Sequence, residues 1–114
     1  TRVTLSTHAL TDAVRRVSLL SNKVSPVQIK VDAESGVMTL VTNSQDIGNA
    51  QENLICEIEG ESVDIAFNYS FLLDGLNSIT TDAVHLDLFG SMKPGILRAT
   101  EGENFLYLIM PVRV

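Results

Sequence analysis

The chain has 114 residues, of which 45% are hydrophobic and 19% are charged, a balance that supports a folded core and excludes a disordered segment. With 8 basic and 14 acidic side chains the net charge is −6, which argues against an independent nucleic-acid-binding module. The single cysteine, Cys56, excludes a disulfide framework and a multi-cysteine zinc site, and we therefore expect a cytoplasmic protein. No apolar run is long enough to cross a membrane, and no signal-peptide pattern is present.

The chain length predicts one domain covering residues 1–114, and no stretch of biased composition suggests a linker. Because the first residue is Thr1 rather than Met, we expect a fragment or a processed chain.

Two segments carry apolar residues at helical spacing, residues 10–20 and residues 68–79. Ser6 or Thr7 can cap the first helix and Asn68 the second, because short polar side chains accept hydrogen bonds from the free amides of a first turn. Elsewhere the apolar residues mostly alternate with period two, as in half-buried strands. We expect strands at residues 3–5, 27–31, 37–41, 53–59, 63–67, 84–88, 96–99 and 105–110.

The two halves of the chain resemble each other. Placing Ser6 on Asn68 also places Leu10 on Leu72 and Val14 on Leu76, and a strand precedes each helix. Each half therefore has the order β-α-β-β-β. The predicted fold class is α+β: two such repeats, with both helices packed on one side of antiparallel sheets.

None of the motifs of enzymes or metal sites is present. Cys56 lies in a strand pattern and is best explained as a structural thiol, because no His and Asn accompany it as in a cysteine nucleophile. His8 and His85 belong to different elements and form no metal signature. We therefore expect no cofactor, no metal and no catalysis.

Three other features admit more than one interpretation. Arg15, Arg16 and Lys23 either complement the dipole at the end of the first helix or face phosphates. Leu19 falls on the polar face of that helix, where it is either a single exposed leucine or a subunit contact. The apolar carboxyl terminus is expected to be held in a sheet and to form the lip of an apolar groove around Met110.

Specific motifs carry a family resemblance over essentially the whole chain. Residues 65–76 (IAFNYSFLLDGL) look like a strand-Asn-helix signature, and residues 107–114 (YLIMPVRV) like a characteristic carboxyl terminus; Leu19-Leu20-Ser21-Asn22 and Ile47-Gly48 fit as well. Together they resemble the third, carboxyl-terminal domain of the bacterial DNA polymerase III beta subunit, the sliding clamp family.

The resemblance implies a non-enzymatic processivity factor, a head-to-tail dimer of three-domain subunits closed around duplex DNA, with helices lining the hole. It also implies a groove that binds short motifs of the replicative polymerase alpha subunit, other polymerases, the clamp loader and repair proteins. The positions matching this domain's wall of the groove are Val24, Asn68, Phe71, Met92, Pro94, Leu108, Ile109, Met110, Pro111, Val112, Arg113 and Val114. Phe71 stands where the family often has Tyr, and Val114 where Leu is common.

The same resemblance assigns the remaining residues. Leu19 and Leu20 match an apolar patch at the subunit interface, and residues 47–54, with Ile47, Asn49 and Glu52, the strand that meets the next subunit. Arg15, Arg16 and Lys23 become DNA-facing charges on a helix that lines the hole. The alternative from another class is a stand-alone α+β adaptor that binds peptides in the same terminal groove.

Overall fold

The computed structural model describes residues 1–20, 26–44, 48–101 and 105–113. The elements, in chain order, are β1 (Arg2–Ser6), α1 (Thr7–Leu20), β2 (Val27–Asp32), β3 (Val37–Ser44), β4 (Gly48–Ile55), β5 (Glu57–Glu59), β6 (Val63–Phe67), α2 (Tyr69–Asn77), β7 (Ala83–Asp87), β8 (Gly95–Ala99) and β9 (Leu106–Ile109). Neither helix is long and apolar enough, within the described part of the chain, to cross a membrane.

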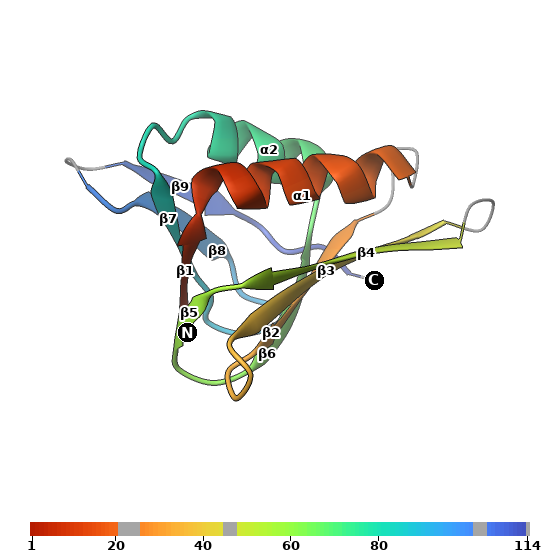
Figure 1. Ribbon diagram of the computed structural model, residues 1–114, viewed down its shortest axis with the longest axis horizontal. Coiled ribbons are helices and arrows are strands. Elements are labelled where there is room, and N and C mark those ends of the chain that lie inside the picture. Colours follow the sequence, from red (N-terminus) through yellow and green to blue (C-terminus); the bar gives the residue numbers. More distant parts are fainter. Residues whose placement is uncertain (21–25, 45–47, 102–104, 114) are drawn as a thin grey trace.

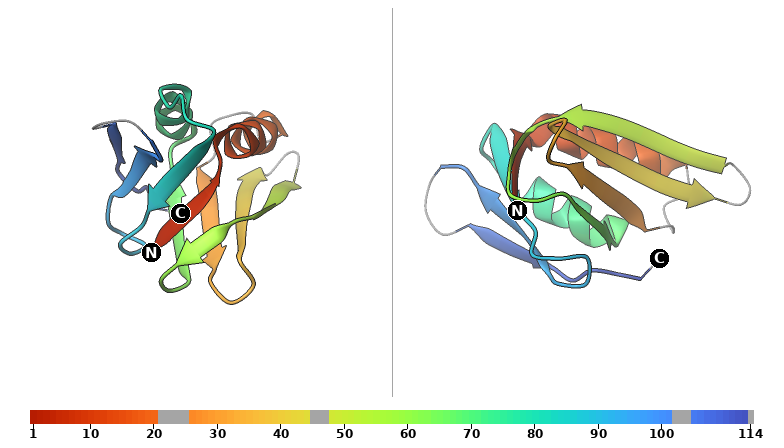
Figure 2. Two further views of the ribbon diagram at one scale, coloured as in Figure 1. Left: turned by 60° about the vertical axis from the view of Figure 1, so that its left-hand side comes forward. Right: turned by 90° about the horizontal axis from the view of Figure 1, so that it is seen from below.

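The strands form two antiparallel sheets. Sheet A has the order β5-β1-β7-β8-β9 and sheet B the order β4-β3-β2-β6. Both helices lie side by side on one side of the molecule, with the two sheets beneath them (Figures 1 and 2). This arrangement confirms the predicted fold class and leaves the outer faces of both sheets without a covering layer.

The internal repeat is confirmed by the pairing of the strands. The first half consists of β1, α1, β2, β3 and β4, and the second of β6, α2, β7, β8 and β9. The strand before each helix joins the sheet of the other half, because β1 pairs with β7 and β6 pairs with β2. Leu10 and Leu72, each the fourth residue of its helix, are both fully buried. The halves therefore share one core and cannot be separate domains.

Both helices begin at the predicted caps. The Ser6 hydroxyl accepts a hydrogen bond from the Ala9 amide at 3.1 Å, and the Asn68 side-chain oxygen accepts from the Ser70 and Phe71 amides at 2.8 and 3.3 Å. Helix α2 is shorter than predicted, because Ile79 follows the helix and packs into the core from the connecting loop. The apolar spacing therefore located the buried face correctly but not the end of the helix.

One predicted strand is wrong. Residues 53–59 were expected to form one strand, but the chain leaves sheet B after Ile55 and enters sheet A at Glu57. Cys56 lies at the crossing, where its amide donates to the Gly36 carbonyl oxygen at 2.9 Å. Period-two alternation continues through the crossing, so it cannot show that the two pieces belong to different sheets.

Cys56 is a half-buried structural thiol. Its Sγ lies 3.7 Å from the Gly36 carbonyl oxygen, and burial raises the pKa of the thiol. A raised pKa reduces the thiolate fraction and with it the reactivity of the sulfur.

Candidate peptide-binding and assembly surfaces

The carboxyl-terminal segment connects the two sheets. Strand β9 is one of the two edge strands of sheet A and pairs with β8. Beyond it, Pro111 forms an isolated β-bridge with Phe67, and the Val112 amide donates to the Ala66 carbonyl oxygen at 2.9 Å. The tail therefore crosses from sheet A to the free edge of β6 in sheet B, a path consistent with the prediction that a sheet holds the apolar terminus.

Four of the predicted groove residues are large apolar side chains left open to solvent. Phe71, Met92, Leu108 and Met110 have exposed fractions between 55% and 60%. Pro94, Pro111 and Val112 are half-buried, whereas Arg113 is exposed. Large apolar side chains that gather in one patch mark a contact surface, whereas single exposed ones need no explanation.

Ile109 is a correction to the predicted groove. Its side chain is 1% exposed and belongs to the core. It alternates along β9 with Leu108, which points to the outer face. Only the outward residues of a strand can contribute side-chain surface to a groove, so Ile109 supports the groove from beneath.

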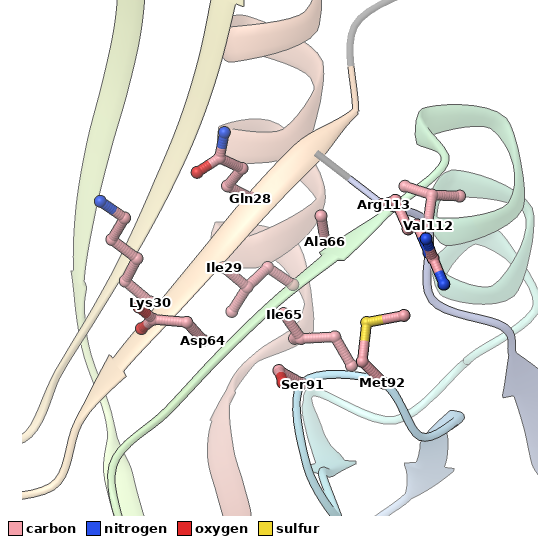
Figure 3. Close-up of a pocket in the computed structure, with 10 residues that line it drawn as sticks. All are labelled: Gln28, Ile29, Lys30, Asp64, Ile65, Ala66, Ser91, Met92, Val112 and Arg113. Atoms are coloured by element: carbon pink, nitrogen blue, oxygen red, sulfur yellow. The ribbon is translucent and has the colours of Figure 1, made fainter.

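A pocket of about 470 Å³ lies where the tail meets sheet B (Figure 3). Met92, Val112 and Arg113 of the predicted groove contribute to its lining. The other lining residues are Gln28, Ile29, Lys30, Asp64, Ile65, Ala66 and Ser91. No sequence signal places these residues in the groove, because the β6 residues meet the tail only through its contacts with Ala66 and Phe67, and the β2 residues only through pairing with β6. Leu108, Met110, Pro94 and Phe71 do not line this pocket, so the predicted wall extends beyond it.

Asn68 can serve both of the roles considered for it. The cap uses the side-chain oxygen, which accepts from two amides of α2. Its amide group carries two further donors that the cap does not need. Because the residue is exposed, these donors are accessible to a bound peptide.

The predicted DNA-facing arginines point in different directions. Arg15 donates from Nη2 to Asn77 Oδ1 of α2 at 3.4 Å, across the two helices. Arg16 instead donates from Nη2 to Glu52 Oε1 of β4 at 2.8 Å. This hydrogen bond raises the pKa of Arg16 and lowers that of Glu52. Lys23 lies outside the described residues.

The predicted interface region contains an open edge and an exposed leucine. Strand β4 is an edge strand of sheet B, as predicted, and Leu19 is 63% exposed near the end of α1. Glu52 is engaged within the chain by Arg16, so it is not a free charge. Ile47, Val24 and Val114 lie outside the described residues, as do the side chains of Leu20 and Asn49.

Comparison with known proteins decides the family. Residues 1–113 match the model of the DNA polymerase III beta subunit, C-terminal domain. The chain belongs to this family. The beta sliding clamp of Streptomyces coelicolor is 37% identical over 116 residues, covering 96% of this chain and 30% of that protein. The beta sliding clamp of Staphylococcus aureus is 34% identical over 102 residues, covering 89% of this chain and 27% of that protein.

Solved clamps have the same fold. The DNA polymerase III beta subunit of Thermotoga maritima matches with a TM-score of 0.92 at 29% identity, covering 99% of this chain and 30% of that one. The Bartonella birtlesii sliding clamp bound to griselimycin matches with a TM-score of 0.90 at 29% identity, and the match again covers 99% of this chain and 30% of that one. The chain therefore spans about a third of the length of the clamps that it matches.

A second depression, of about 540 Å³, lies between the start of α1 and the end of α2 in this clamp domain. It is mostly polar, and in it His8 Nε2 lies 3.0 Å from Asp12 Oδ2. His85 is remote, with Nδ1 2.7 Å from the Thr4 hydroxyl. No group of three or more metal-ligating side chains occurs among the described residues. The two histidines therefore do not share a site.

Proposed function

We propose that this chain is the third domain of a bacterial sliding clamp, a non-catalytic ring that encircles duplex DNA and tethers the replicative polymerase. The family match and the length of the relatives, about three times this chain, support two similar domains before Thr1. A ring holds DNA by its topology. The net charge of −6 is therefore compatible with a DNA-encircling role that needs no strong affinity of this domain alone.

We propose further that the carboxyl-terminal surface is this domain's wall of a groove for short peptide motifs. The observation that carries this assignment is the tail that crosses from β9 to β6, with Leu108 and Met110 exposed beside it. Exposed Met and Leu side chains suit a surface that accepts several partners, because Met is flexible and polarizable. The partners we propose are the polymerase alpha subunit, other polymerases, the clamp loader and repair proteins.

The test uses the full-length clamp with Met110→Ala combined with deletion of Arg113 and Val114. Fluorescence anisotropy measures the binding of a labelled Gln-Leu-x-Leu-Phe peptide to this variant. The affinity should fall at least a hundredfold, which corresponds to about 2.7 kcal/mol, or one to two buried apolar side chains. The dimer dissociation constant, measured by sedimentation, should not change. Unchanged peptide affinity would place the peptide site elsewhere.

A matched control removes a different exposed leucine. Leu19→Ala should weaken the dimer and leave the peptide affinity of the remaining dimer unchanged, because Leu19 lies at the end of α1 on another surface.

We also propose a cytoplasmic location, where a replication clamp meets its DNA. The solved clamp from B. birtlesii binds griselimycin, and we propose that this chain's full-length protein binds it too.

A further inference from the structure

The end of α1 is attached to sheet B at two points. The Thr42 hydroxyl of β3 donates to the Val17 carbonyl oxygen at 2.9 Å, in a buried position. The residue just before Val17, Arg16, donates to Glu52 of β4 at 2.8 Å. Figure 1 shows this half of α1 running above β3 and β4. The two contacts fix the helix end relative to the edge of the sheet.

Glu52 is an unusual residue for its position. It lies opposite Leu40 in the ladder, so its side chain points to the helix-covered face of the sheet, between Ala50 and Leu54 on the same strand. It is also the only ionisable residue of β4. A charge pointing inward at an edge strand needs a partner, because its carboxylate would otherwise lose water without compensation. Arg16 is that partner in this structure.

The helix end also presents an apolar side chain close to this pair. Leu19 lies three residues after Arg16, about one turn further along the same helix, and is 63% exposed. Strand β4 pairs only with β3 among the described residues, so its outer backbone groups are open. With Arg16 and Glu52 neutralising each other, this surface combines an apolar side chain with an unpaired strand edge. A strand from another chain and an apolar side chain would complement it.

We infer that Arg16 and Glu52 are a positioning pair: Arg16 holds Glu52 against α1 and thereby keeps Leu19 and the β4 edge in one surface for a second copy of the clamp subunit. The inference rests on the proposed clamp function. It removes Arg16 from the DNA-facing residues and leaves Arg15 as the described arginine on α1 that is not paired with an acid.

The test compares Arg16→Gln and Glu52→Gln in the full-length clamp. Each should raise the dimer dissociation constant about fivefold, the upper end for a partly exposed ion pair. The double change R16E with E52R should bring it back to within about twofold of the original. Arg16→Lys, which keeps the charge, should weaken the dimer less than Arg16→Gln does. The melting temperature of each variant separates loss of positioning from loss of folding.

Arg15→Gln is the matched control, because Arg15 is the neighbouring residue on the same helix but contacts α2. It should leave the dimer unchanged and weaken binding of a short fluorescent duplex at low salt, which Arg16→Gln should not do. The inference is overturned if Arg16→Gln weakens duplex binding without affecting the dimer. It is also overturned if the double change R16E with E52R fails to restore the dimer dissociation constant. If Leu19→Ala also leaves the dimer intact, the proposed subunit surface itself is wrong, which is a separate failure.

Discussion

At the scale of single residues, charge compensation determines what each side chain can do. Asp87 is the clearest case, because it is nearly buried on the outer face of sheet A between two arginines. Arg2 Nε lies 2.7 Å and Arg98 Nε 2.8 Å from its two carboxylate oxygens. Burial by itself would raise the pKa of Asp87, but the hydrogen bonds from Arg2 and Arg98 outweigh it and lower the pKa.

We predict that Asp87→Asn destabilises the domain by about 1–2 kcal/mol at pH 7, because it removes the carboxylate charge from three hydrogen bonds, two from Arg2 and one from Arg98. Because the pKa of Asp87 is lower in the folded state than in the unfolded state, its ionised carboxylate stabilises the folded domain at pH values above the unfolded pKa. This contribution is lost as the pH falls through the folded pKa. The difference between the two proteins should therefore shrink below about pH 4. Urea unfolding from pH 7 to pH 2.5 measures it.

The control for this prediction is Asp64→Asn, since Asp64 is an exposed strand residue. It should change the free energy of unfolding by less than about 0.5 kcal/mol. An Asp87→Asn effect that stays constant with pH would contradict the ion-pair explanation.

Close packing constrains two glycines. A Cβ on Gly95 would lie 2.6 Å from Cζ of the buried Phe67, and a Cβ on Gly75 would lie 2.7 Å from Cδ1 of Tyr107. Phe67 is fully buried and Tyr107 is half-buried, but a Cβ on Gly75 would also lie 2.8 Å from Cδ1 of the buried Leu97. In α2, alanine also gains about 1 kcal/mol in helix propensity over glycine.

We therefore predict that Gly95→Ala costs about 2–3 kcal/mol and Gly75→Ala clearly less. Thermal unfolding ranks the two variants. Adding Phe67→Leu to Gly95→Ala should recover part of the loss, whereas purely additive effects would show that Phe67 is not the clashing group.

At the scale of elements, the start of α2 joins stability to recognition. Asn68 caps the helix through its oxygen, and its amide donors face solvent beside the proposed groove. Asp retains the oxygen acceptor but lacks the donors, so it separates the two roles.

We predict that Asn68→Ala lowers the free energy of unfolding by about 1 kcal/mol, whereas Asn68→Asp leaves it within about 0.5 kcal/mol. Both should weaken the clamp-motif peptide several-fold in anisotropy. If Asn68→Asp binds as tightly as the original, the residue is only a helix cap.

At the scale of the whole molecule, the exchanged strands make one cooperative unit. Strand β1 completes the sheet of the second half, and β6 completes that of the first. The hydrophobic core includes residues of both helices and both sheets. Neither half can bury its apolar face alone.

We predict that residues 61–114 expressed alone are unfolded, because β7 lacks its β1 partner and β6 its β2 partner. Circular dichroism should show no cooperative thermal transition, whereas the complete domain should unfold in one step. Adding residues 1–60 in trans should restore structure. A folded half would show that the repeats are independent.

The elements that depend on local chemistry could be predicted from the order of the side chains. Helix caps at Ser6 and Asn68, the repeat that places Leu10 on Leu72, and most strands follow from side-chain spacing, because period and capping are properties of short segments. The exposed position of Leu19 followed from the same helical geometry.

The features that depend on contacts between distant segments could not be predicted in this way. The break at Cys56, the burial of Ile109, the pocket residues on β2 and β6, and the pairing of Arg16 with Glu52 all arise from strand pairing and from packing of α1 on sheet B. Such contacts join residues far apart in the chain, and alternation or helical spacing carries no information about which strand lies next to which. Charged side chains in particular look alike in the sequence, and only their partners in space distinguish them, Glu52 for Arg16 and Asn77 for Arg15.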